Sequence, residues 1–242
     1  MRASRRALGA AMAGLVAEDV QFSGNTVSLD MSTGSQSHSS RYTGVIYDNI
    51  TGGAASGAFS STDLAATWGD QLGTLGTGTV DACQFSVFNS GSSAGTLIDA
   101  SFQINFYRAS DSSFIGGFNT ATVTFSGGGL SAGFYTTINV TGLSGLGIDL
   151  DTTDIIMTQH VLAQTGSTRL GFVFGGPLLA GTTSPSQVYL DATTVGAAGF
   201  YNITSGGNPV VADAFYSLTV VPSPATAGLL GLGGLLATRR RR

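Results

Sequence analysis

The sequence predicts an all-β protein: a β-sandwich or jelly roll of about ten short antiparallel strands, followed by a short C-terminal hydrophobic helix. Several segments alternate apolar and polar residues with a period of two, the pattern of a strand with one buried face. The 242 residues include 36 glycines, no lysine and only 10% charged residues. That composition favours strands joined by tight turns over a helical bundle.

The segment 97–107 shows the strand pattern most clearly. Ile98, Ala100, Phe102, Ile104 and Phe106 alternate with polar residues, which predicts one buried and one solvated face. Segment 80–89 is similar, with Cys83, Phe85 and Val87 on one face. Further strands are expected at 20–30, 42–49, 120–125, 134–140, 154–162, 169–174, 187–190, 200–203 and 214–220.

The segments between these strands are expected to be turns and loops. The Gly- and Ser-rich segment 90–95 predicts a hairpin loop between two strong strands, and segments 109–113 and 127–129 predict the same. Residues 61–72 open with Ser-Thr-Asp. They are expected to form a single short helix or an irregular loop.

Charge is placed unevenly along the chain. Residues 18–221 contain three arginines and all fourteen acidic residues, so the formal charge of this stretch is 3 − 14 = −11. Such a body repels phosphate backbones, so nucleic-acid binding is not expected. It can attract Ca²⁺, or the charge can simply keep the protein in solution. The single cysteine, Cys83, permits neither an intramolecular disulfide nor a Cys-based zinc site.

The N-terminus has the plan of a secretory signal peptide. Arg2, Arg5 and Arg6 precede an apolar run from residue 7 to residue 16, and Ala17 suits the last position before a cleavage site. Leu15 is larger than the small residue usual at its position. The chain is therefore expected to consist of a signal peptide (1–17), a β-sandwich domain (18–221) and a tail (222–242).

The tail has three parts in order. Pro222, Ser223 and Pro224 break the preceding strand, an apolar segment runs from 225 to 238, and Arg239, Arg240, Arg241 and Arg242 close the chain. Each Arg costs about 2.5 kcal/mol or more at the bilayer centre, so the cluster should stop transfer and stay in the cytoplasm. The apolar residues expected in the membrane are Ala225, Leu229, Leu230, Leu232, Leu235 and Leu236.

Length limits what the apolar segment can do. As a helix it would span about 21 Å, against a hydrocarbon core of about 30 Å. Four glycines within it weaken the helix further. The segment is therefore better suited to transient retention than to permanent anchoring.

This three-part tail resembles the PEP-CTERM sorting signal, which exosortase-type membrane enzymes handle in Gram-negative bacteria that make exopolysaccharide. Ser223 stands where the Pro-Glu-Pro pattern has Glu. The resemblance covers residues 222–242 and implies export, transient inner-membrane anchoring by the C-terminus, and delivery to the cell surface or extracellular matrix. Segments 68–72, 80–89 and 102–107 resemble the β-sandwich domains often joined to this tail.

Few residues suggest chemistry. Asp149, Asp151 and Asp154 form Asp-x-Asp-x-x-Asp between strands, a spacing that can hold Ca²⁺ but that also suits local hydrogen bonding in turns. Segment 91–95 matches Gly-x-Ser-x-Gly, yet it lies between strands and not at a strand-to-helix elbow. His38 and His160 are the only histidines, and no Ser-His-Asp arrangement is apparent. No catalytic residue and no enzyme activity are expected.

Three function hypotheses follow. The first is a structural or adhesive protein of the cell surface or biofilm matrix, sorted through its tail. The second is a carbohydrate-binding module for matrix polysaccharide, with or without Ca²⁺. The third, a secreted hydrolase, would need a cleft that joins His160 to a Ser and an Asp. The expected partners are the membrane, through the C-terminal segment, an exosortase-type processing enzyme and exopolysaccharide. Apart from Ca²⁺, no cofactor is expected.

Overall fold

The structure is a computed structural model. It describes residues 21–32, 44–51, 54–61, 63–90, 95–176, 178–183, 187–191, 197–202, 204–205, 208–209 and 213–221. The expected signal peptide, the sorting tail and the expected C-terminal helix lie outside these residues. Within the described part, no helix has the length and apolar character needed to cross a bilayer.

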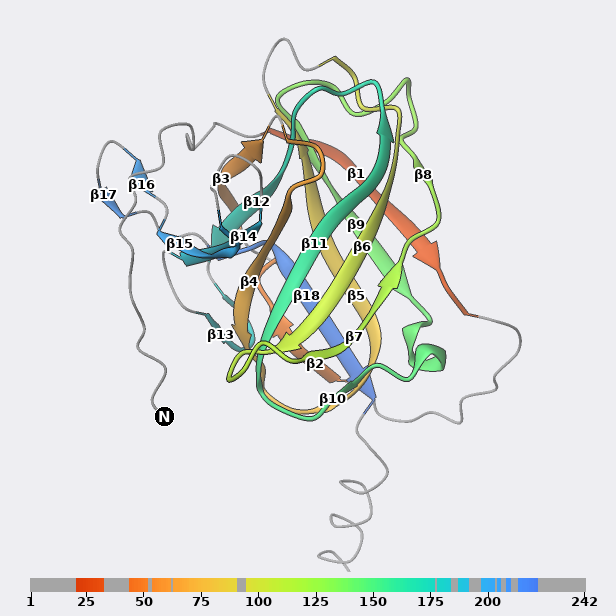
Figure 1. Cartoon of the computed structure of the whole chain (residues 1–242). Helices are drawn as coiled ribbons and strands as arrows, with labels where there is room; N and C mark the ends of the chain where they lie inside the picture. The colour runs from red at the N-terminus through yellow and green to blue at the C-terminus, as the bar shows by residue number, and fades with distance from the viewer. Residues whose placement is uncertain are drawn as a thin grey trace, which may run out of the picture.

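The described residues form two β-sheets, which confirms the all-β sandwich (Figure 1). Sheet A contains β1 (Gln21–Asp30), β2 (Gly44–Asp48), β3 (Ala54–Ser61), β5 (Gly78–Asn89), β9 (Phe134–Thr141), β10 (Asp149–Leu150), β12 (Leu170–Gly176) and β18 (Tyr216–Val221). Sheet B contains β4 (Thr67–Gly73), β6 (Asp99–Arg108), β7 (Phe114–Asn119), β8 (Val123–Thr124), β11 (Asp154–Thr165), β13 (Thr182–Thr183), β14 (Gln187–Asp191) and β15 (Gly199–Asn202). A small hairpin, β16 (Thr204–Ser205) with β17 (Asn208–Pro209), and a 3₁₀ turn (Leu143–Leu146) complete the described elements.

The order of the strands places β5 inside sheet A and β11 inside sheet B. β5 pairs with β9 along one edge and with β18 along the other, while β11 lies between β4 and β6. The described pairings are antiparallel, with one exception: β1 runs parallel to β9. In Figure 1 the strands β4, β11 and β6 lie nearer the viewer than β5, β9 and β18.

The core fills the space between the two sheets. Phe85 on β5 meets Phe102 on β6 edge-on, with ring centroids 5.3 Å apart, and Trp68 on β4 lies 6.1 Å from Phe172 on β12. All four side chains are fully buried. The predicted buried faces of β5 and β6 are therefore confirmed, except that Ile98 precedes β6 and is 39% exposed.

The expectation of a helix or loop over residues 61–72 is wrong for its second half, because residues 67–72 belong to the strand β4, while residues 63–66 form a turn. Trp68, Asp70 and Leu72 alternate inward and are fully buried. Gly69 faces outward, where an added Cβ would lie 2.2 Å from the carbonyl oxygen of Met157 on β11. Glycine thus permits the close approach of β4 and β11. Strands β3 and β7 were not predicted from the sequence.

The hairpin expected at residues 90–95 is also wrong. This segment leaves β5 in sheet A and enters β6 in sheet B, so it crosses between the sheets. Residues 127–129 likewise join β8 of sheet B to β9 of sheet A, and all three glycines have positive φ. Segment 109–113 is the one expected hairpin loop that is confirmed, since β6 pairs directly with β7.

Asn89, at the end of β5, ties these crossing segments together. Its Nδ2 donates to the backbone oxygens of Gly95 (3.0 Å) and Leu130 (2.7 Å), and its Oδ1 accepts from the Ser167 hydroxyl at 2.7 Å. The side chain is fully buried. One amide therefore holds three connections that meet at the same end of the sandwich.

Replacing this amide should weaken the fold. Asn89→Ala removes three hydrogen bonds from a fully buried site, so we expect the free energy of unfolding in urea to fall by about 3 kcal/mol. Asn105→Ala is the matched control, because Asn105 is only half-buried and its side chain makes one hydrogen bond among the described residues, to Gln103. That change should cost less than about 1 kcal/mol. Equal losses in the two variants would contradict the role assigned to Asn89.

Candidate functional site

The residues predicted for sorting lie outside the described part of the chain. They are Pro222, Ser223 and Pro224, the apolar residues from Ala225 to Leu236, and the four terminal arginines. His38 and Ser92 also lie outside it. The last described strand, β18, ends at Val221, immediately before Pro222.

The three aspartates proposed for Ca²⁺ each have a different partner. Asp149 accepts a hydrogen bond from the Thr79 hydroxyl. Asp151 forms an ion pair with Arg108, which lowers the pKa of this exposed carboxyl. Asp154 accepts from Gln71 Nε2 at 2.7 Å. The described residues contain no group of three or more His, Cys, Asp or Glu side chains placed to hold a metal ion, so the structure does not bring these carboxylates together as ligands.

His160 lies on the outward face of β11. Its Nδ1 is 3.2 Å from the Thr67 hydroxyl on β4, and its neighbour on β6 is Gln103. Thr67 and Gln103 supply no carboxylate to orient the imidazole, so this pairing lacks a part that a hydrolytic triad requires.

Four aromatic side chains line the outward face of sheet B, and we call them the aromatic stripe: Tyr107, Phe114, Tyr189 and Phe200. Tyr107 and Phe114 are paired on β6 and β7, with ring centroids 5.6 Å apart and edge-on. Tyr189 and Phe200 are paired in the same way on β14 and β15, at 5.7 Å. Phe114 is 59% exposed and Phe200 is 36% exposed.

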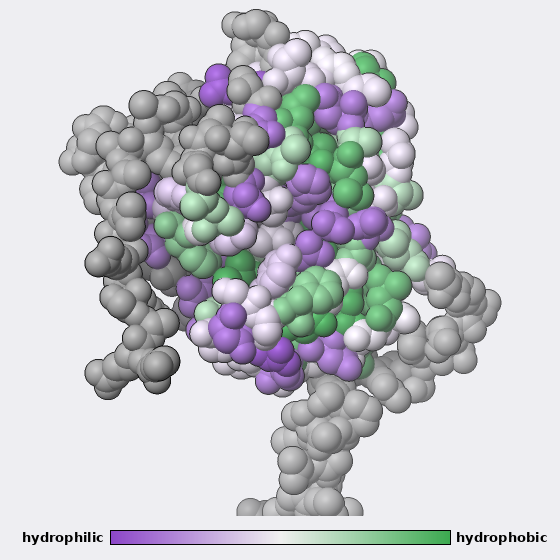
Figure 2. Space-filling model, viewed as in Figure 1, coloured by the Kyte–Doolittle hydropathy of each residue, from purple (hydrophilic) through white to green (hydrophobic). Residues whose placement is uncertain are grey.

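The two aromatic pairs belong to one surface. The register of the strands places all four rings on the same face of sheet B, and burial raises the pKa of the Tyr189 hydroxyl. β14 and β6 are separated by β4 and β11, which places them about 14 Å apart. Figure 2 shows hydrophobic groups interspersed with hydrophilic ones over this face.

Polar side chains stand beside the stripe. They share the outward face of β4, β11 and β6: Thr67, Gln71, Gln103, Asn105 and His160. Asn105 lies against Gly117 on β7, where an added Cβ would be 2.3 Å from the amide oxygen. Amide donors and acceptors thus lie next to exposed rings, a combination suited to contact with hydroxyl-rich ligands.

Sequence reasoning found these residues separately but missed the stripe. Tyr107, Tyr189 and Phe200 fall in segments that were expected to be strands, 97–107, 187–190 and 200–203. Phe114 was not placed, because β7 was not recognised. The register of β6 against β7 and of β14 against β15 brings the rings to one face, and one sequence does not reveal strand pairing between distant segments.

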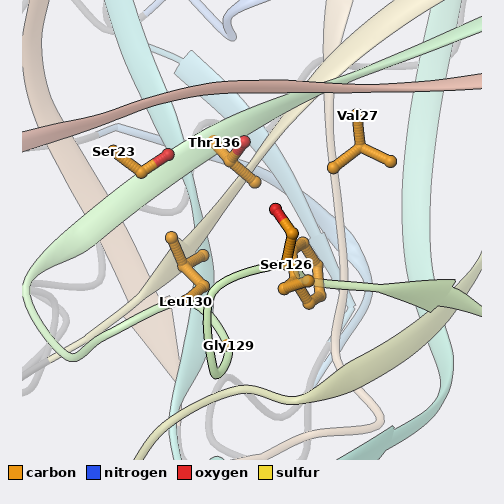
Figure 3. A pocket seen from close by; sticks show the side chains of 7 residues that line it. Ser23, Val27, Ser126, Gly129, Leu130 and Thr136 are labelled. Carbon is orange, nitrogen blue, oxygen red and sulfur yellow. The ribbon is translucent and has the colours of Figure 1, made fainter.

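A small hollow lies beneath β1, apart from the stripe. Its lining includes Ser23 and Val27 of β1, Thr136 of β9, and Phe125, Ser126, Gly129 and Leu130 of the segment that connects β8 to β9 (Figure 3). Its volume is about 30 Å³. Pockets for small molecules usually measure about 300–1,000 Å³, so this hollow is too small for a sugar ring.

The interior also holds a buried carboxyl group. Asp70 on β4 accepts hydrogen bonds from the backbone N–H of Ala214 at 2.8 Å and of Gln71 at 2.7 Å. Burial raises the pKa of Asp70 well above its usual range, partly offset by these donors. The hydroxyls of Tyr47 and Tyr216 are buried without a partner among the described residues, and burial, with Asp70 next in effect, raises the pKa of each.

Asp70 has a structural role in this arrangement. Ala214 bridges to Phe174 of sheet A, so the carboxyl of β4 connects the two sheets just before β18. Asp70 is fully buried, so it cannot contact a ligand at the surface. The aromatic stripe has exposed rings, and it is the candidate functional site.

Comparison with known proteins adds no relative. No protein-family model, no curated protein and no solved structure matches the chain.

The buried carboxyl predicts an unusual dependence of stability on pH. A raised pKa in the folded state means that the unfolded chain loses this proton first, so stability is lost as pH rises from about 4 through the folded pKa. Asp70→Asn removes the titration. Relative to the parent, the free energy of unfolding of the variant should therefore rise by at least about 1 kcal/mol between pH 4 and pH 7. Urea unfolding at each pH measures it.

Asp30→Asn is the control with the opposite sign. The Ser32 backbone N–H lowers the pKa of this exposed carboxyl. The stability of the parent should therefore rise slightly relative to that of Asp30→Asn as pH rises. If the difference between the parent and Asp70→Asn does not change with pH, the buried-carboxylate account is incorrect.

Proposed function

We propose that this chain is an exported protein of structural or adhesive type, sorted to the cell surface or extracellular matrix through a PEP-CTERM-like tail. The order of proline break, apolar segment and arginine cluster over residues 222–242 carries the proposal. The sandwich supports it, because β18 ends at Val221 and the tail follows the last strand directly. Residues 222–242 can thus be held or cut without removing any described strand.

The proposed route has two stages. The apolar segment lodges transiently in the inner membrane, with the arginines retained in the cytoplasm. An exosortase-type enzyme then cuts near Pro222 to Pro224 and releases the sandwich to the exterior. In this scheme the body contributes binding surface and stability, and it carries out no catalysis.

Deleting the arginine charge should abolish membrane retention. In a Gram-negative host that contains an exosortase, replacing all four terminal arginines with glutamine should lower the membrane-bound intermediate about tenfold or more, measured by fractionation and intact mass. Ser223→Glu should speed release of the tail relative to the matched change Ser223→Ala. Parent chain found uncut and free in the cytosol would contradict the proposal.

The aromatic stripe favours a second candidate function, binding of a neutral polysaccharide. Exposed rings can stack against the apolar face of a sugar, and the neighbouring amides can bond to its hydroxyls. The four rings carry no formal charge, the charged groups beside them include Asp154, which accepts from Gln71, and Asp191, which neighbours Tyr189 on β14, and the body has a formal charge of −11. Anionic chains should therefore be repelled, and a neutral glycan fits better.

Truncating an exposed ring should separate this function from general adhesion. Phe114→Ala should weaken binding to a soluble neutral β-glucan about tenfold, equivalent to about 1.4 kcal/mol, in affinity electrophoresis with alginate as the anionic comparison. The matched control is Phe22→Ala on β1, since Phe22 is 47% exposed and lies outside the stripe. Equal retardation of both variants, or none for the parent, would exclude the stripe as a glycan site.

A further inference from the structure

The strand β1 is held by a single neighbour. It pairs with β9 at the edge of sheet A, and no other described strand pairs with it. The pairing is parallel, which is slightly less stable per residue than an antiparallel ladder. None of the β1 residues with described burial is fully buried. β1 is therefore attached more weakly than the strands around β5.

The ladder between β1 and β9 is also interrupted. Phe22 lies opposite Tyr135 and Thr26 opposite Thr137, so four steps along β1 correspond to two along β9. The hollow lined by Ser23 and Val27 lies beside this irregularity (Figure 3). Empty space on one side of Val27 reduces the dispersion contacts of its side chain, which lowers the cost of removing β1.

The position that β1 occupies is nevertheless specific. Val27 and Leu29 lie opposite Ile138 and Val140 and pack against the core. On the other face the hydroxyl oxygens of Thr26 and Thr137 are 3.0 Å apart. A shift of one residue would reverse both faces, so this edge of β9 selects the sequence and register of β1.

The connection to the rest of the domain is long enough for exchange. Eleven residues, 33–43, separate the described end of the β1 segment from β2. Fully extended, they reach about 40 Å, which is about the diameter of a domain of this size. β1 of one chain can thus reach the β9 edge of an adjacent chain while β2 keeps its place in the first chain.

We propose that β1 is an exchangeable strand, and that the β9 edge of one chain accepts β1 of a second copy of this chain. The contacts are the same within one chain and between two, so chain concentration and linker reach set the balance. Reciprocal exchange gives a dimer, and sequential donation gives a chain of molecules. This assembly does not depend on the sorting tail or on glycan binding.

A disulfide between two chains tests the proposal. We would co-express full chains carrying Thr26→Cys with full chains carrying Thr137→Cys, purify them together, and oxidise them. Neither chain can form the 26–137 bond alone, so exchange predicts a covalent dimer, at least tenfold above the control, whose cross-linked peptide joins positions 26 and 137. Cys83 stays out of the reaction, because it is 1% exposed and burial raises the pKa of its thiol.

Two controls make each outcome decisive. Thr26→Cys chains with Thr165→Cys chains provide the matched pair, since Thr165 is exposed on sheet B, and these should not form the dimer. A single chain with both Thr26→Cys and Thr137→Cys reports the register. If the double variant forms the intramolecular 26–137 disulfide and the mixture gives no dimer, exchange is refuted. If no 26–137 bond forms in either, β1 does not lie at this register, and the proposal also fails.

Discussion

Packing between the two sheets is the constraint on which the rest of the structure depends. The described chain has no disulfide, because its one cysteine is free, and Arg108 with Asp151 is the ion pair found among the described residues. The inward faces of the sheets are buried against each other, as Phe85 is against Phe102, and this burial stabilises the sandwich. Each strand has to present alternate apolar residues to the other sheet, which fixes its register.

Buried polar groups make this packing specific. Gln159 of sheet B donates to the backbone oxygen of Ser86 in sheet A at 3.0 Å, and Asp70 reaches across to the N–H of Ala214. Such groups cost free energy unless they are paired, so each one disfavours a slipped arrangement of the sheets. They fix which residues face one another, whereas apolar burial alone would tolerate several registers.

The sequence predicted the fold class and most strands because alternation survives wherever one face is buried, as in residues 100–106. It failed for β4, where Gly69 and Asp70 are poor strand formers that the structure uses for close approach and for an inter-sheet bond. It also failed for the connection from β5 to β6, because alternation does not show which sheet a strand joins. The aromatic stripe depends on the same pairing information and was missed for the same reason.

The arrangement of strands separates the features proposed for sorting and for assembly. β5 pairs through Cys83 with Val140 of β9 on one side and with Leu218 of β18 on the other. The tail leaves from β18, while β1 docks on the far edge of β9. Because β5 and β9 lie between β18 and β1, a chain held by its tail still presents the β1 edge to a neighbour. The aromatic stripe lies on sheet B, whereas β1, β9 and β18 belong to sheet A, so retention, exchange and ligand contact use different parts of the described surface.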